Sequence, residues 1–152
     1  MIDELEALYR ERVQEFRRVA AAIAGDRELG CDAVQDAFAR AVRNRRSFRG
    51  SGTLEAWVWR IVVNAARDAR RRRGPEHASN SLLLDGSSER GGEPLPLALL
   101  TSRQREIVFL HYYADLDYGA IADALSISPG TVGATLHAAR QTLRGALEEV
   151  RA

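Results

Sequence analysis

The placement of proline and glycine divides this 152-residue chain into two helical stretches separated by a linker. Residues 2–73 contain no proline, and their apolar side chains recur at three- and four-residue spacing, as in amphipathic helices. Residues 74–94 are rich in Gly, Ser and Pro, which favour turns and loops. We therefore predict an all-α protein with two small helical domains, 1–73 and 95–152, joined by a flexible acidic linker, 74–94.

Composition excludes several classes of protein. The single cysteine, Cys31, cannot form an intramolecular disulfide and has no Cys/His cluster beside it, which rules out a disulfide scaffold and a structural zinc site. No apolar run approaches the roughly 18 residues of a membrane span, and the N-terminus is acidic where a signal peptide is basic. We expect a protein of the reducing cytoplasm that is neither inserted in a membrane nor exported, and that holds no metal or cofactor.

Positive charge is concentrated in the N-terminal domain. Residues 1–73 hold 16 Arg against 11 acidic residues, a net charge of +5, whereas residues 74–100 and 101–152 carry −3 and −1. The chain has no Lys, and Arg offers a planar fork that suits phosphates and base edges. Domains of this size bury only a modest fraction of their surface, so we expect both to dock on larger partners.

Three helices are predicted in the N-terminal domain. The first ends near Gly25, the second runs from about Cys31 to Arg45, and the third runs from the N-cap Thr53 to about Arg72. The second helix is predicted to bury Val34, Ala37, Phe38, Ala41 and Val42. The third is predicted to bury Leu54, Trp57, Val58, Ile61, Val62, Ala65 and Ala69. Trp59 lies off this stripe, so it either packs against the first helix or lines a nucleic-acid channel.

The opposite face of the third helix is basic. Arg60, Asn64, Arg67 and Arg71 follow one another at intervals of four, three and four residues, so three guanidinium groups and an amide share one strip. Such a strip suits a nucleic-acid backbone. Residues 70–73 are all Arg and continue the strip, so we expect phosphate contacts there rather than only a solvated helix end.

The C-terminal domain has the spacing of a helix-turn-helix. Thr101 is predicted to cap one helix; a short helix then spans 118–125, and another spans about 129–145 with Ser128 at its cap. Ser126 stands in the tight turn where such motifs often use Gly, so we expect a small left-handed strain there. A motif of this kind places its second helix in the DNA major groove.

Three segments carry a family resemblance. Residues 32–41 read Asp-Ala-Val-Gln-Asp-Ala-Phe-Ala-Arg-Ala; residues 47–64 begin Ser-Phe-Arg-Gly-Ser-Gly-Thr and end Arg-Ile-Val-Val-Asn; residues 100–132 begin Leu-Thr-Ser-Arg-Gln-Arg-Glu and end Ser-Pro-Gly-Thr-Val. In this order, around a linker, they resemble the sigma factors of bacterial RNA polymerase, of the extracytoplasmic-function type in the sigma-70 family. The resemblance implies a non-enzymatic factor that binds core polymerase and recognises and melts the minus-35 and minus-10 promoter elements.

The resemblance also implies roles for individual residues of the N-terminal domain. The outward face of the second helix would dock on the clamp coiled coil of the polymerase through Gln35, Asp36, Arg40 and Arg43. The following loop and the third helix would open the minus-10 element and hold a flipped base through Phe48, Arg49, Gly50, Trp59, Arg60, Asn64, Arg67 and Arg71. The polymerase flap and promoter DNA are further implied partners, and an anti-sigma factor is a candidate one.

In the C-terminal domain the resemblance implies a helix that reads the minus-35 element. Its candidate DNA-binding residues are Ser128, Thr131, Thr135, His137 and Arg140. The chain departs from the family here, because three of the four basic side chains usual in this helix are missing and Gly133, Ala134 and Ala138 replace longer side chains. Fewer phosphate contacts lower the salt-dependent affinity, so we expect weak upstream recognition.

Two function classes besides a sigma factor are considered. An enzyme is not expected, because the sequence has no phosphate-binding glycine loop, nucleophile elbow or His/carboxylate metal motif. The stronger alternative is a divergent sigma-like interaction protein that binds polymerase or an anti-sigma factor with weak or no promoter reading. The two differ in whether a holoenzyme formed with this chain opens a promoter.

Overall fold

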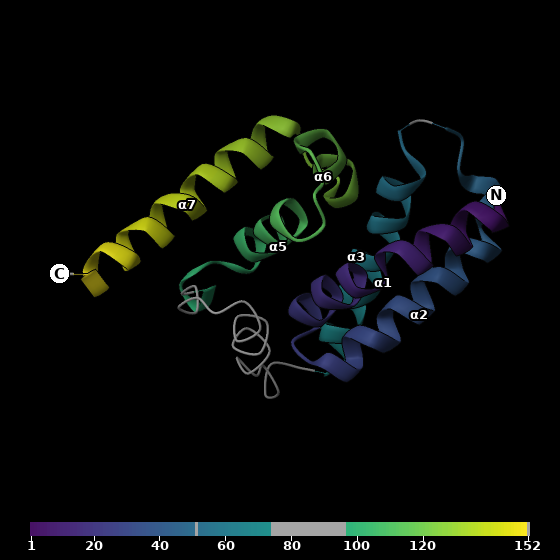
Figure 1. Cartoon of the computed structure of the whole chain (residues 1–152), viewed down its shortest axis with the longest axis horizontal. Helices are drawn as coiled ribbons and strands as arrows, with labels where there is room; N and C mark the ends of the chain where they lie inside the picture. The colour runs from purple at the N-terminus through teal and green to yellow at the C-terminus, as the bar shows by residue number, and fades with distance from the viewer. Residues whose placement is uncertain (51, 74–96, 152) are drawn as a thin grey trace.

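The structure is a computed structural model and describes residues 1–50, 52–73 and 97–151 (Figure 1). Every regular element in this part of the chain is helical, which confirms the all-α prediction. The α-helices are α1 (Ile2–Ala24), α2 (Arg27–Arg43), α3 (Leu54–Arg73), α5 (Ser102–Tyr112), α6 (Tyr118–Leu125) and α7 (Pro129–Arg151), with short 3₁₀ turns at Arg45–Ser47 and Leu97–Leu99. The predicted linker, 74–94, lies outside the described residues.

Helices α1 and α2 form a tight hairpin. Gly25 ends α1 as predicted, in the left-handed conformation that a helix C-cap favours (φ 83°). The Asp26 side chain accepts a hydrogen bond from the backbone N–H three residues on (2.9 Å), so α2 begins at Arg27, earlier than predicted. A Cβ added to Gly30 would lie 2.5 Å from the backbone of Ala21, so glycine is required where the two helices cross.

Aromatic rings fill the core of the N-terminal domain. Trp59 and Phe16 are fully buried with ring centroids 4.3 Å apart, and Phe38 lies edge-on to Phe16 at 5.2 Å. Aromatic pairs at these separations stabilise a core beyond the area they bury. Trp59, which the sequence places off the main stripe of α3, is therefore a central core residue.

The buried face of α3 is wider than the sequence predicts. Helices α1, α2 and α6 all pack on it, so Val63 and Ala66 are buried along with Val58, Val62, Ala65 and Ala69 of the predicted stripe. Four other predicted core residues are half-buried: Phe38, Leu54, Trp57 and Ile61. In α2, Val42 is 37% exposed rather than buried, because it lies in the last turn of that helix.

The C-terminal domain has the predicted helix-turn-helix. Thr101 and Gln104 form a reciprocal capping box at the start of α5, with hydrogen bonds of 3.0 and 3.1 Å. Ser126 adopts the expected left-handed conformation in the turn after α6 (φ 58°, ψ 46°). Ser128 caps α7 by accepting a hydrogen bond from the Thr131 N–H (3.1 Å). Helix α7 extends beyond the predicted end at residue 145, to Arg151.

The two helical domains pack against each other. Helix α6 lies on α3, and α5 lies near α1, so the domains meet through the first two helices of the C-terminal domain (Figure 1). Helix α7 packs on α5 and α6 and lies on the side of its domain away from α3. Contact between the domains is a feature that the sequence does not predict.

Candidate polymerase and nucleic-acid interfaces

The outward face of α2 carries paired charges. Arg40 forms an ion pair with Asp36 one turn earlier (2.7 Å) and a longer one with Asp68 of α3 (3.8 Å). Gln35 and Arg43 are exposed on the same helix. The four residues predicted to bind core polymerase therefore share one polar surface, and Arg40 links that surface to α3.

An open groove of about 830 Å³ runs beside this surface, between α2 and the C-terminal end of α3. It is lined by Asp26, Leu29, Asp32, Ala33, Asp36, Arg40, Ala69, Arg72 and Arg73. The carboxylates come from α2 and the preceding turn, and two of the three guanidinium groups come from α3. The groove can therefore accept a partner that itself presents both signs of charge.

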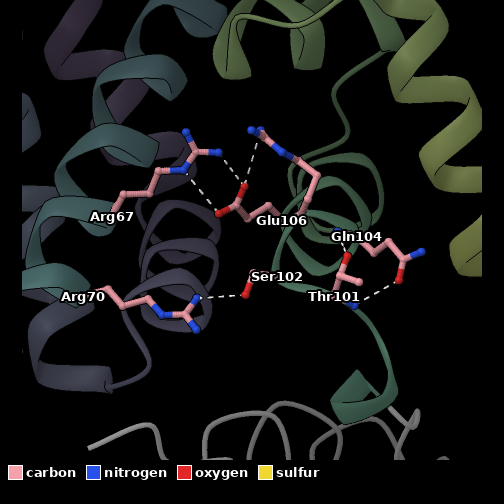
Figure 2. Close-up of polar contacts among 7 residues, drawn as sticks. Arg67, Arg70, Thr101, Ser102, Gln104 and Glu106 are labelled. Carbon is pink, nitrogen blue, oxygen red and sulfur yellow. Dashed lines mark hydrogen bonds and ion pairs between the residues drawn. The ribbon is translucent and has the colours of Figure 1, made fainter. Parts of the chain in front are cut away.

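The basic strip of α3 divides into two parts. Arg60, Asn64 and Arg71 are exposed, as a DNA-binding role requires. Arg67 instead turns to the C-terminal domain, where its Nη2 and Nε donate to the two carboxylate oxygens of Glu106 (2.6 and 3.3 Å; Figure 2). The sequence therefore predicts the basic strip, but it does not predict that Glu106 binds Arg67.

Arg70 also faces the C-terminal domain, with its Nη1 donating to the Ser102 hydroxyl (3.3 Å; Figure 2). Burial lowers the pKa of Arg105, and the nearby positive charge of Arg70 acts in the same direction. The end of α3 and the start of α5 are thus close enough for their charges to interact.

The loop between α2 and α3 contains two glycines in conformations that other residues rarely adopt. Gly50 and Gly52 both have positive φ angles (78° and 91°), which glycine adopts without strain. Phe48 packs on Trp57 with ring centroids 5.5 Å apart, and Arg49 is exposed. The described part of this loop therefore combines a pair of packed aromatic rings, an exposed guanidinium group and two glycines with positive φ angles.

Trp59 does not belong to this surface. It is 0% exposed and lies against Phe16 of α1, so its folded side chain cannot contact DNA. Of the two roles that the sequence leaves open for Trp59, packing against the first helix is the correct one. Trp57, beside Phe48, is the indole that lies close to the loop.

The predicted reading helix, α7, keeps few free polar groups. The Ser128 and Thr131 hydroxyls lie 2.8 Å apart in the N-cap, Thr135 is half-buried, and His137 is exposed. Arg140 is exposed but its Nε donates to the Tyr112 hydroxyl (2.7 Å), and this hydrogen bond raises the pKa of Arg140. The one basic side chain left from the family pattern is thus held at the side of the helix.

Tyr118 and Tyr112 are residues of this surface that the sequence does not single out. A Cβ added to Gly133 would lie 3.3 Å from the ring of Tyr118, so this glycine faces an aromatic side chain rather than open solvent. Tyr112 is 51% exposed beside Arg140. Local spacing does not reveal either contact, because each tyrosine contacts a residue of a different helix; Tyr112 and Arg140, for example, are 28 residues apart in the chain.

Among the residues that the structure describes, no cluster of three or more His, Cys, Asp or Glu side chains could hold a metal ion. None of the described helices is both long and apolar enough to span a membrane. The candidate surfaces described above are the α2 face, the α3 strip with its loop, and α7.

Family models match both domains. The model described as Sigma-70 region 2 matches residues 8–76, and the model described as Sigma-70, region 4 matches residues 97–143. The chain is 31% identical over 154 residues to the ECF RNA polymerase sigma factor SigE of Mycolicibacterium smegmatis, covering 91% of this chain and 60% of that protein. It is 26% identical over 157 residues to the RNA polymerase sigma factor YlaC of Bacillus subtilis, covering 93% and 91%.

Two solved structures share the fold. CnrH, solved in complex with the cytosolic domain of CnrY, matches with a TM-score of 0.75 and 22% identity, covering 98% of this chain and 90% of that one. The Bartonella quintana sigma factor RpoE, solved with the anti-sigma factor NepR, matches with a TM-score of 0.68 and 21% identity, covering 94% and 98%. With region 2 and region 4 matched in the expected order, the chain belongs to the sigma-70 family of RNA polymerase sigma factors, in its extracytoplasmic-function group.

Proposed function

We propose that this chain directs transcription initiation, binding core RNA polymerase through α2 and recognising and melting promoter DNA through α3 and the helix-turn-helix. The observation that carries the proposal is the pairing of a region 2 domain, with a basic strip on α3, and a region 4 domain in one chain. The role is binding rather than catalysis, and it belongs to the bacterial cytoplasm, where the polymerase works.

The α2 surface is the proposed dock for the polymerase clamp coiled coil. A polar partner helix can form ion pairs with both the carboxylates and the guanidinium groups of Asp36 and Arg40, while Gln35 and Arg43 supply hydrogen bonds at the edges. The C-terminal domain is the proposed dock for the polymerase flap. An anti-sigma factor would compete for the same surfaces.

The loop and the exposed part of the α3 strip are the proposed minus-10 site. Arg60 and Arg71 would neutralise phosphates, and the Asn64 amide would hydrogen-bond a base taken out of the stack. The glycines of the loop let the backbone approach that base closely. Arg49 adds a cation on the same loop.

One observation favours a second candidate function, that of a sigma-like interaction protein with little promoter reading. In α7 the Arg140 side chain is bound to Tyr112, and the Ser128 and Thr131 hydroxyls contact each other in the N-cap. Of the five predicted reading residues, this leaves the exposed His137 and the half-buried Thr135 to read the minus-35 element. This arrangement supports weak upstream recognition. The arrangement of side chains in α7 has no bearing on recognition at the proposed minus-10 site.

Transcription by reconstituted holoenzyme decides between these functions. Core polymerase from the source organism, with and without this chain, is supplied with fragmented genomic DNA, and transcript 5′ ends are mapped by sequencing. We expect discrete start sites that depend on the chain and share an upstream motif. Tight binding to core with no chain-dependent start site would instead establish the interaction protein.

Asn64→Ala tests the minus-10 site. The loss of one hydrogen bond to an extruded base costs about 1.5 kcal/mol, so open complexes should form about tenfold more slowly at a mapped promoter. Gln14→Ala, on the exposed face of α1, is the control and should leave the rate unchanged. Core affinity should be the same for all three proteins. An Asn64→Ala holoenzyme that opens the promoter at the parental rate would refute the role of Asn64.

A further inference from the structure

The Arg140 side chain of α7 is held by a residue of another helix. Its Nε donates to the Tyr112 hydroxyl oxygen of α5 (2.7 Å), and its guanidinium carbon lies 5.7 Å from the centre of the Tyr112 ring. A guanidinium group carries N–H donors on Nε and on both Nη atoms, and this hydrogen bond uses only the one on Nε. Nη1 and Nη2 therefore keep donors for a ligand.

The charge of Arg140 has no carboxylate partner. Among the residues that the structure describes, none of the ion pairs includes Arg140. The hydrogen bond with Tyr112 raises the pKa of Arg140, and Tyr118 acts more weakly in the same direction, so neither group that favours the charged form is acidic at neutral pH. Arg140 is exposed, and it therefore presents an uncompensated positive charge at the surface of α7.

Tyr112 is itself held by a row of rings. His111 lies edge-on to Tyr112 with ring centroids 4.8 Å apart, and Tyr118 of α6 lies 5.7 Å from His111. The His111 Nδ1 atom lies 3.1 Å from the Leu116 carbonyl oxygen, which can only accept, so Nδ1 carries a proton and donates it. These contacts fix the Tyr112 hydroxyl, and through it Arg140, which lowers the entropy lost when a long side chain is ordered on binding.

Arg140 lies too far along α7 to read bases. The helix begins at Pro129, so Arg140 is about 16 Å further along the axis at about 1.5 Å per residue. The major groove is only about 12 Å wide and about 8.5 Å deep, and a reading helix contacts base edges through its N-terminal residues. A side chain three turns along the helix therefore lies at the level of the phosphate backbone.

We propose that Tyr112 and Arg140 together bind one phosphate at the edge of the minus-35 duplex. The Nη groups of Arg140 donate to the phosphate oxygens, and the Tyr112 hydroxyl, which accepts from Nε, donates its own hydrogen to the same phosphate. A phosphate contact positions the duplex but carries no sequence information. The Tyr112–Arg140 pair therefore anchors α7 on DNA while base recognition stays weak. This inference deepens the proposed function and rests on it.

The first experiment measures the binding of reconstituted holoenzyme to a mapped promoter duplex at four salt concentrations. Arg140→Gln removes charged hydrogen bonds, so it should weaken binding at least about tenfold and lower the slope of log K against log salt by about 0.9. Tyr112→Phe removes only the hydroxyl and should weaken binding about fivefold. Because both side chains act on one phosphate, the loss in the double variant should be smaller than the product of the separate losses.

Two control variants match these changes. Arg144→Gln removes an exposed charge one turn further along α7, and Tyr9→Phe removes the hydroxyl that Arg17 contacts in the N-terminal domain (3.4 Å). Both should bind the promoter as the parent does. Affinity for core polymerase should be equal for all of these proteins, which separates a contact with DNA from a contact with the polymerase.

The second experiment locates the phosphate. Promoter duplexes are synthesised with one uncharged methylphosphonate at a time, across and beside the minus-35 element. We expect one position at which this substitution weakens binding by the parental holoenzyme about tenfold and has little effect on the Arg140→Gln holoenzyme. A purely structural role for Arg140 would not make the two holoenzymes differ at any single phosphate.

Three results would overturn the inference. Equal affinities and salt slopes for Arg140→Gln and the parent, or the lack of a phosphate position that distinguishes them, would show that Arg140 binds no phosphate. Losses that multiply fully in the double variant would remove Tyr112 from the site. The absence of any chain-dependent start site would instead overturn the proposed function, and this inference with it, before any variant is compared.

Discussion

At the scale of single residues, two positions of α7 differ in whether their side chains face solvent or another side chain. The sequence treats Gly133 and Ala138 alike, as places where the family carries basic side chains. In the structure Ala138 is exposed, whereas a Cβ added to Gly133 would lie 3.3 Å from the ring of Tyr118, so the ring must shift slightly to accept a side chain there. The direction in which a helical residue points is set by packing from elsewhere in the chain, which local spacing does not reveal.

Arginine at these two positions should therefore have unequal effects. Ala138→Arg should add one phosphate contact, steepening the salt dependence of holoenzyme binding to a mapped promoter duplex by about 0.9 in log K against log salt. Gly133→Arg should add less, because the new side chain would start toward the ring of Tyr118, which must shift to accept it. Titrations at four salt concentrations measure both slopes. Equal steepening by the two variants would show that Tyr118 does not restrict this face.

At the scale of helices, sequence rules predicted the caps well and the edges of the buried faces poorly. Thr53, Thr101 and Ser128 each accept the predicted hydrogen bond at a helix start, because capping depends only on residues three positions apart. The burial of Trp59 in place of Trp57 was beyond local rules, because it depends on where α1 places Phe16.

The turn between α6 and α7 offers a stability prediction. Ser126 holds a left-handed conformation that disfavours any residue with a Cβ, so Ser126→Gly should raise the free energy of unfolding by about 0.5–1 kcal/mol. Urea unfolding followed by circular dichroism measures this change. The control is Gly145→Ser, the opposite exchange at an exposed position inside α7. It should also raise the free energy of unfolding, because serine has a higher helix propensity than glycine. A loss of stability in Ser126→Gly would contradict the strain.

The α2 surface offers a binding prediction. Exchanging the charges in Asp36→Arg with Arg40→Asp keeps an ion pair on the helix but places like charges opposite any complementary partner. Affinity for core polymerase should fall at least tenfold, or about 1.4 kcal/mol, as measured by competition for labelled core. The exposed pair of α1 supplies the matched control, Glu6→Arg with Arg10→Glu, which should bind as the parent does. Equal core affinities would place the polymerase on another surface.

At the scale of the whole molecule, the order of domains could be predicted and their packing could not. Periodicity and capping residues are local, so they indicate two helical units, and the family motifs indicate what each unit binds. The contact between Arg67 and Glu106 joins residues 39 positions apart, and neither has a local neighbour that signals the other. The predicted division between the domains, 74–94, lies outside the described residues.

The same ion pair limits how freely the halves of sigma factors can be exchanged. A chimera that joins this N-terminal domain to a region 4 domain with a neutral residue in the place of Glu106 would leave Arg67 without its carboxylate partner. Such a hybrid would combine intact recognition surfaces with a weakened contact between its two domains. Synthetic factors assembled from separate parts would then need matching charges at this contact as well as a chosen promoter preference.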